Sequence, residues 1–350
     1  ALNNPLMQIS IYAVMLFVLM FGSEMIIKTN ATSLDVGQLS TLMTYGFQIM
    51  VSLMMLSMVF VMITFSEESS KRIVEVLNEK SSITSKANAI TEVKDGSIDF
   101  DHVRFKYSPT AERPVLENID VHINSGETIG IIGGTGSAKS SFVQLIPRLY
   151  DVTEGTVRVG KEDVRDYDLV TLRDSVAMVL QKNVLFSGTI ADNIRWGNKD
   201  ATLEEVKHVC HLACADEFIE QMPDGYDTWI EQGGTNVSGG QKQRLCIARA
   251  LLKQPKILIM DDSTSAVDTK TDAMIRKAMK EYIPETTKII IAQRTSSVED
   301  ADRIIVLDGG KIDAIGTSEE LLKTNQIYRE VYLSQNKQGT EEIVEEGGVR

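Results

Sequence analysis

Cysteine is scarce in this chain, which argues against a disulfide-stabilised fold. Cys210, Cys214 and Cys246 are the only cysteines among 350 residues. Three residues cannot supply the set of paired bridges on which small secreted domains depend, and they fit a reducing compartment for the region that holds them. The chain is instead long enough to bury hydrophobic cores in about two domains.

Positive charge is also in short supply. The chain carries 36 Lys and Arg residues against 49 Asp and Glu residues, so its formal net charge is -13 and its pI is near 4.9. Such a balance gives no broad attraction to the phosphates of nucleic acids or to anionic lipid headgroups. We therefore expect no nucleic-acid partner.

Charge is missing altogether from residues 5–23 and 36–66. A helix of roughly 20 apolar residues crosses the ~30 Å hydrocarbon core of a bilayer, so we expect two membrane helices within residues 1–66. The turn-forming segment 28–35 would join them, and Lys71 and Arg72 indicate that the second helix ends on the cytoplasmic side. A cleaved signal peptide fits less well, because there are two such stretches and the second runs directly into a charged helix.

After the second apolar stretch the sequence changes character. Residues 67–97 are expected to form a cytoplasmic helix extension and a linker. Across residues 98–333 short apolar strands alternate with helices, which predicts an α/β domain with a mostly parallel sheet covered on both faces. A hairpin is expected to turn on Asp308, Gly309 and Gly310. Residues 334–350 are acidic and are expected to be a disordered tail.

The stretch GGTGSAKSS fits the phosphate-binding pattern G-x-x-x-x-G-K-[ST], except that Ala138 replaces the second glycine. In such a loop the backbone N–H groups surround phosphate oxygens, Lys139 faces the β and γ phosphates, and Ser140 ligates Mg²⁺. An ordinary strand-to-helix turn is the alternative. The predicted nucleotide-binding residues here are Gly133, Gly134, Thr135, Gly136, Ser137, Ala138, Lys139, Ser140 and Ser141.

The stretch KILIMDD places two carboxylates, Asp261 and Asp262, at the end of an apolar strand. In proteins with a phosphate-binding loop, the first acid holds Mg²⁺ and a carboxylate beside it can orient a water molecule. A solvated acidic strand end is the alternative. Because both motifs occur in one chain, each strengthens the other.

A second glycine-rich helix start lies in NVSGGQKQRLCIARAL. Ser238, Gly239 and Gly240 precede an amphipathic helix, so a hydroxyl and free amides are available to an anion. One nucleotide does not need two glycine-rich anion-binding segments in one domain, so we expect the second segment to face the nucleotide of another chain. Here the sequence resembles the ATP-binding cassette (ABC) transporter family over residues 98–333.

This resemblance implies a fold, two cofactors and further site residues. The fold is two α-helical transmembrane segments followed by an α/β P-loop NTPase cassette with an antiparallel β-subdomain and a helical subdomain; the cofactors are ATP and Mg²⁺. Tyr107 matches the aromatic residue that stacks on adenine. Gln181 matches a glutamine that touches Mg²⁺, as Ser140 and Asp261 do. Gln241 continues the signature motif, and Asp268 matches an aspartate at the interface between two cassettes.

Three departures from the family pattern affect this chain's own site. Asp262 stands where hydrolysing cassettes carry glutamate, Gln293 stands where they carry a histidine, and Ala138 adds a methyl group to the loop. A carboxylate that is one methylene shorter moves by about 1 Å, which can cost on the order of 10²-fold in rate. The signature motif is intact, so the chain resembles the degenerate-site subunit of a heterodimeric exporter. Asp262, Gln293 and Gln181 are its predicted catalytic residues, and catalysis is expected mainly at the partner's site.

The two apolar helices resemble the last two of the six in an ABC exporter half-transporter. Because the chain begins with Ala1, we expect a C-terminal fragment of a multi-pass protein of the cell membrane, with its cassette in the cytoplasm. The expected partner is a second half-transporter, and the expected substrates are hydrophobic or amphipathic drugs, lipids or peptides. Methionines in the second helix suit such substrates, although methionine that faces lipid explains them equally well. A homodimer with two slow sites and a membrane-tethered ATP-binding regulatory module remain alternatives.

Two pairs of side chains could suggest a metal site. His208 and His211 flank Cys210 and Cys214 at helical spacing. In the helical subdomain that the resemblance implies, these residues are expected to serve packing instead.

Overall fold

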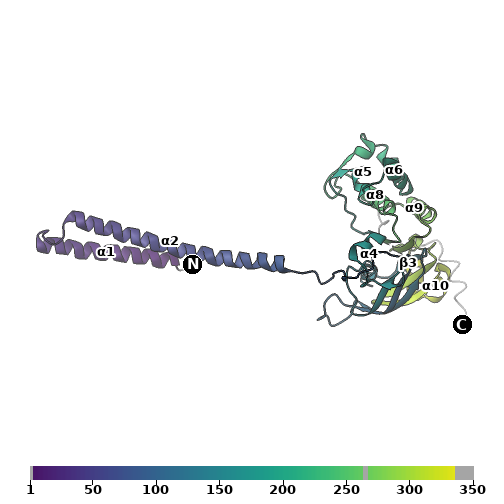
Figure 1. Ribbon diagram of the computed structural model, residues 1–350, viewed down its shortest axis with the longest axis horizontal. Helices are drawn as coiled ribbons and strands as arrows, with labels where there is room; N and C mark the ends of the chain where they lie inside the picture. The colour runs from purple at the N-terminus through teal and green to yellow at the C-terminus, as the bar shows by residue number, and fades with distance from the viewer. Residues whose placement is uncertain (1–2, 263–266, 336–350) are drawn as a thin grey trace. The chain divides into compact units, whose positions relative to one another are not determined.

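The computed structural model describes residues 3–262 and 267–335. It divides into two compact units, Ala1–Ser82 and Ile83–Arg350 (Figure 1). The predicted acidic tail, apart from its first residues, lies outside the described part of the chain. Each unit is described separately below.

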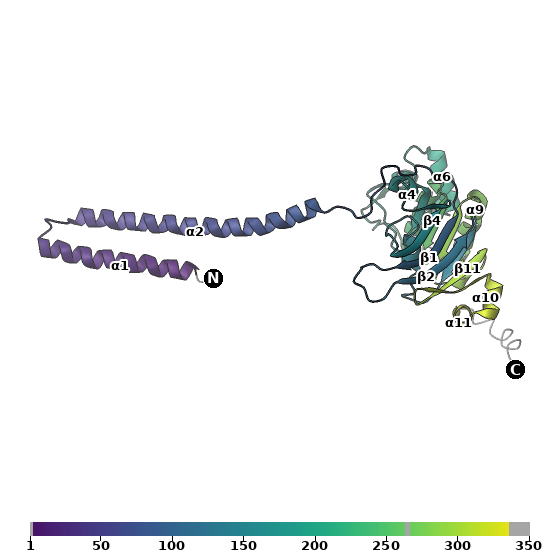
Figure 2. The ribbon, with the colours of Figure 1, turned by 60° about the horizontal axis from the view of Figure 1, so that its bottom comes forward.

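The N-terminal unit is a hairpin of two long helices. Helix α1 spans Asn3–Thr29 and α2 spans Val36–Asn78, and Figure 2 shows α1 running alongside the first part of α2. The turn before α2 closes with Asp35, whose Oδ1 accepts a hydrogen bond from Gln38 N at 2.7 Å, while Asp35 N donates to Gln38 Oε1 at 3.1 Å. This reciprocal cap supplies partners for amides at the helix start.

Both helices are long and apolar enough to cross a membrane. The candidate spans are Pro5–Thr29, with mean hydropathy 2.0, and Val36–Asn78, with mean hydropathy 2.3. No described residue of α2 is buried within the structure. Many of the large apolar side chains of this unit are exposed, as the lipid-facing side chains of a membrane helix would be.

The C-terminal unit contains two main sheets. The larger has the strand order β12-β11-β3-β10-β9-β6 and is parallel except for the β11–β12 hairpin, which turns at Gly309 and Gly310 as predicted. Its strands are β3 (Thr128–Ile132), β6 (Val176–Val179), β9 (Ile257–Asp261), β10 (Thr287–Ile291), β11 (Arg303–Asp308) and β12 (Lys311–Gly316). The smaller sheet is antiparallel, with the order β2-β1-β4-β5, and consists of β1 (Ile98–Phe105), β2 (Leu116–Ile123), β4 (Glu154–Val159) and β5 (Glu162–Asp163).

Helices cover the larger sheet and also form a lobe of their own. Figure 1 shows α5, α6 and α8 gathered in this lobe, apart from the strand β3. Strands β7 (Gly188–Thr189) and β8 (Trp229–Ile230) pair at its base. The helices are α3 (Lys139–Gln144), α4 (Leu169–Ser175), α5 (Ile190–Arg195), α6 (Leu203–Leu212), α7 (Asp216–Ile219), α8 (Gly239–Leu252), α9 (Thr269–Tyr282), α10 (Ser318–Thr324) and α11 (Gln326–Gln335), with 3₁₀ helices η1 (Gly225–Asp227) and η2 (Thr295–Ser297). The antiparallel subdomain and the helical subdomain are thus both present.

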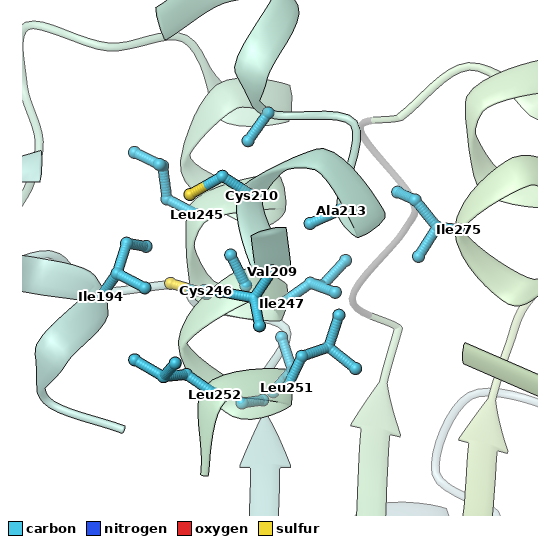
Figure 3. Packing of buried hydrophobic residues seen from close by; sticks show 14 of the residues in the cluster. Ile194, Val209, Cys210, Ala213, Leu245, Cys246, Ile247, Leu251, Leu252 and Ile275 are labelled. Carbon is cyan, nitrogen blue, oxygen red and sulfur yellow. The ribbon is translucent and has the colours of Figure 1, made fainter. Parts of the chain in front are cut away.

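The helices of the lobe share a hydrophobic cluster with residues of β6, β9 and α9, and the cysteines are packing residues in it. In Figure 3 the side chains of Cys210 and Cys246 lie among Val209, Leu245 and Ile247. All three cysteines are free and buried, and burial raises the pKa of the Cys210 thiol to about 12. The thiol is therefore protonated at neutral pH and is a poor metal ligand. Within the described residues, one group of three His, Cys, Asp or Glu side chains lies close enough to share an ion, namely Asp101, His102 and Asp120, and all three are exposed.

Part of the predicted linker belongs to the C-terminal unit. Ile90 forms a parallel bridge with Tyr167, and Ser85 Oγ accepts a hydrogen bond from Leu169 N at 2.9 Å. Thr84 O accepts one from Arg148 at 3.3 Å. These contacts join residues far apart in sequence, so a local pattern could not reveal them. The boundary at Ile98 itself remains a prediction.

Candidate functional site

The glycine-rich loop connects β3 to α3 at the carboxyl edge of the parallel sheet, where ligands of such sheets bind. Gly133 is required by packing, since a Cβ there would collide with the carbonyl oxygen of Leu307. Gly136 has a φ of +82°, and a Cβ on Gly134 or Gly136 would meet no atom within 4 Å. The loop is therefore held against the protein at its first residue and faces open space further along. This shape fits a phosphate group.

Ala138 keeps the backbone conformation that the usual glycine would have. Its φ is 71° and its ψ is 21°, in the left-handed region, and it forms the N-cap of α3. A residue with a Cβ costs roughly 1–2 kcal/mol in this region. Alanine is therefore held here in a conformation that glycine adopts without a Cβ penalty.

Lys139 is folded onto the loop that precedes it. Its Nζ donates hydrogen bonds to Gly133 O at 2.7 Å and to Gly134 O at 2.9 Å. Burial lowers the pKa of Lys139, and the carboxylates of Asp261 and Asp262 oppose that shift. The Lys139 ammonium group thus lies at the loop with Asp261 and Asp262 nearby, where it could bind an anion such as a phosphate.

Ser140 and Asp261 lie together, as predicted for magnesium ligands. Ser140 Oγ donates to Asp261 Oδ2 at 2.8 Å. Burial raises the pKa of Asp261; the hydrogen bond from Ser140 opposes this shift, and the neighbouring charge of Asp262 adds to it. A hydroxyl and a carboxylate are oxygen ligands of the kind that Mg²⁺ prefers, so this pair fits the ion.

The three predicted catalytic residues also meet. Asp262 Oδ2 accepts a hydrogen bond from Gln181 Nε2 at 3.4 Å and a second from Gln293 Nε2. Asp262 follows β9, Gln181 follows β6 and Gln293 follows β10, and these three strands are neighbours in the parallel sheet. Asp262 itself has a φ of 50°, and its N–H donates to Ile291 O at 2.9 Å. One carboxylate oxygen therefore receives both amides.

Tyr107 lies between the antiparallel sheet and α3. Its hydroxyl is 2.8 Å from Ser141 Oγ, and its ring meets Tyr150 edge to face with centroids 5.0 Å apart. The residue is 52% exposed, so part of the ring remains open to a base. Tyr150 was not predicted from the sequence, because only the fold brings it to Tyr107.

The signature residues Ser238, Gly239, Gly240 and Gln241 form the start of α8. Ser238 N donates to Gln241 Oε1 at 2.9 Å, and Gln241 N donates to Ser238 Oγ at 3.3 Å. Ser238 and Gly239 are exposed. Because α8 belongs to the helical lobe and not to the region of β3, the structure places the signature residues apart from the chain's own phosphate loop (Figure 1).

Asp268 caps α9. Its Oδ1 accepts a hydrogen bond from Thr271 N at 3.0 Å, and this backbone bond lowers the pKa of the carboxyl group. The side chain is exposed. A structural role at the helix start thus accompanies the interface role that the resemblance implies.

Comparisons with known proteins agree with this geometry. Residues 116–265 match the family described as ABC transporter. The chain is 38% identical over 338 residues to the "Uncharacterized ABC transporter ATP-binding protein YfiB" of Bacillus subtilis (strain 168), covering 96% of this chain and 58% of the relative. It is 40% identical over 275 residues to the "Putative multidrug export ATP-binding/permease protein YgaD" of the same organism, covering 78% of this chain and 47% of the relative. The chain thus spans about half the length of these curated relatives.

A solved structure gives the same result for the fold. The bacterial Atm1-family ABC exporter with ATP bound superposes with a TM-score of 0.74 at 34% identity, over 86% of this chain and 53% of that one. Two apolar helices followed by a cassette with an antiparallel β-subdomain and a helical lobe are thus shared with that protein. Together with the phosphate loop, the paired carboxylates and the signature helix, these matches show that the chain belongs to the ABC transporter family.

Proposed function

We propose that this chain is part of one subunit of an ATP-driven exporter in the cell membrane, and that its own nucleotide site binds ATP with Mg²⁺ but hydrolyses it slowly. Similarity to a relative named as a putative multidrug export protein and to an exporter solved with ATP supports the general activity. The state of the site is argued from the chain's own residues.

The residues present fit the nucleotide. The amides of residues 133–138 and the Lys139 ammonium would hold the phosphates, and Tyr107 would stack on the adenine ring. Ser140, Asp261 and Gln181 would hold Mg²⁺, which when bound neutralises charge on the phosphate oxygens. Each of these groups comes from the carboxyl edge of the parallel sheet or from a segment packed beside it.

Slow hydrolysis is supported by one observation above all: Asp262 Oδ2 accepts hydrogen bonds from both Gln181 and Gln293, so the carboxylate would have to reach a water molecule with Oδ1. A general base needs a free lone pair within hydrogen-bond reach of the proton it takes. Aspartate is also a methylene shorter than glutamate, and glutamine at position 293 cannot carry the positive charge of an imidazolium. This arrangement favours a site that retains ATP.

The exposed signature residues support a partner. Ser238 and Gly239 are exposed at the start of α8 in the helical lobe, so the Ser238 hydroxyl and the amides of Gly239 and Gly240 would complete the nucleotide site of a second half-transporter. Hydrolysis would then occur mainly in that second site. Helices α1 and α2 would form part of the pathway for hydrophobic or amphipathic substrates such as drugs, lipids or peptides.

Nucleotide trapping tests the proposal. The transporter, assembled with its partner chain, is supplied with a photoreactive ATP analogue during steady turnover, and the nucleotide crosslinked to this chain is recovered. We expect mostly intact triphosphate, and we expect no label on the Lys139→Ala variant. Recovery of mainly diphosphate, formed as fast as overall turnover, would show that this site is catalytically competent.

A further inference from the structure

The last residue that the structure describes, Gln335, reaches the loop that carries Gln293. Gln335 Nε2 donates a hydrogen bond to Gln293 O at 2.7 Å. Its Oε1 accepts from Thr295 N at 2.9 Å and from Thr295 Oγ1 at 3.2 Å. Both ends of one side-chain amide are therefore used on main-chain groups of the same short loop.

The helix that carries Gln335 is firmly anchored. Tyr328 of α11 is fully buried, and its hydroxyl is 2.8 Å from Ser318 Oγ. Tyr328 packs in a hydrophobic cluster that includes Ile132 and Ala292. Ile132 immediately precedes the phosphate loop, and Ala292 immediately precedes Gln293. The helix is thus fixed against the bases of both functional loops.

Gln293 is consequently held from two sides. Its side-chain amide donates to Asp262, and its main-chain carbonyl accepts from Gln335. Thr295, two residues on, is only 1% exposed and is held by the same Gln335 amide. A side-chain amide that makes both a donor and an acceptor bond to a loop can fix its backbone, because losing either bond leaves a polar group without its partner.

We propose that Gln335 is a positioning residue for the nucleotide site, and that α11 sets the placement of Gln293 through it. This inference rests on the proposed function in one respect, namely that the site takes ATP. Under that function Gln293, whose side chain donates to Asp262 at the carboxyl edge of the sheet, would meet the terminal phosphate, so loss of the Gln335 contact should change binding of the triphosphate and leave binding of the diphosphate as it was.

The first test measures ATP and ADP affinity of the full chain in detergent, for the parent and for Gln335→Ala. We expect ATP affinity to fall about 3- to 10-fold, as for loss of one or two hydrogen bonds, with ADP affinity unchanged. The matched control is Ser334→Ala, whose hydroxyl donates to Val331 O of the same helix at 2.7 Å; both affinities should equal those of the parent. Equal ATP affinity in Gln335→Ala, or parallel loss of ATP and ADP binding, would overturn the proposal.

The second test needs no nucleotide. Hydrogen exchange of the Thr295 amide should be about 5- to 10-fold faster in Gln335→Ala, since that amide loses its acceptor and opens locally. Gln335→Glu keeps an acceptor for Thr295 and should retain slow exchange. Unchanged exchange in Gln335→Ala would refute the positioning role. A parent chain that binds neither ATP nor ADP would refute the proposed function, and the exchange measurement would then still test whether Gln335 holds the loop.

Discussion

Ala138 concentrates strain in one residue of the phosphate loop. It adopts the left-handed backbone conformation at the N-cap of α3, and no side-chain hydrogen bond caps that helix at this position. Glycine adopts this conformation without a Cβ penalty. We therefore expect the methyl group at this point to lower the stability of the loop.

Ala138→Gly should stabilise the chain by about 0.5–1 kcal/mol, because the relief of the left-handed strain exceeds the greater entropy of glycine in the unfolded state. Urea unfolding of the C-terminal unit within the full chain measures the change. The matched control is Ala278→Gly in the interior of α9, which should destabilise by about 1 kcal/mol. Destabilisation of similar size at both positions would show that Ala138 is not strained.

At the scale of elements, the contact between the segment after β1 and helix α3 positions Tyr107, the residue proposed to stack on adenine. Tyr107 follows β1, its hydroxyl meets Ser141 on α3, and Phe105 and Tyr150 contact its ring. The ring centroids of Phe105 and Tyr107 are 4.8 Å apart. The tyrosine is thus pre-oriented by groups from both subdomains before any base arrives.

Tyr107→Ala should weaken ATP binding by about 5- to 100-fold, which corresponds to the roughly 1–3 kcal/mol that stacking of a base on an aromatic ring contributes. Tyr107→Phe keeps the ring and loses the hydroxyl contacts to Ser141 and Gln144, so its affinity should stay close to that of the parent. A titration with fluorescent ATP measures both. If the Ala variant binds as tightly as the Phe variant, Tyr107 does not stack on the nucleotide.

Sequence patterns predict elements well where the interaction is local. The strand, glycine loop and lysine at residues 128–139 follow one another directly, and parallel strands bring the segments after β6, β9 and β10 to one edge, so the meeting of Asp262 with Gln181 and Gln293 could be expected. Tyr150 and Gln335 could not, because each reaches its partner through the packing of a helix against distant strands. The contact of Ser85 with Leu169 depends in the same way on tertiary structure.

At the scale of the whole molecule, the proposed function assigns the signature residues of this chain to the nucleotide site of a second cassette. A heterodimer and a homodimer then differ in which nucleotide sites are affected by a substitution in this chain. In a heterodimer, a variant of Ser238 affects the competent site of the partner, whereas a variant of Asp262 affects only the slow site. In a homodimer, both changes affect both sites.

Ser238→Ala should reduce steady-state ATPase activity of the assembled transporter by about 10²- to 10³-fold, since one preorganised donor to the transition state is lost at the working site. Asp262→Asn should be much milder. Each activity is normalised to the amount of assembled complex. Equal damage from the two variants would identify Asp262 as a working base and would favour a homodimer.

Helix α2 runs unbroken through 43 residues, from Val36 to Asn78. At 1.5 Å per residue its length is about 65 Å, roughly twice the ~30 Å hydrocarbon thickness of a bilayer. Under the proposed membrane placement, the C-terminal part of α2 therefore extends beyond the bilayer into water, and the helix can act as a lever. A tilt of about 10° around one end displaces the other end by about 11 Å on this length. Small rearrangements of α2 within the bilayer would thus produce large displacements of its cytoplasmic end. Conversely, a large displacement of the cytoplasmic end would produce only a small movement within the bilayer.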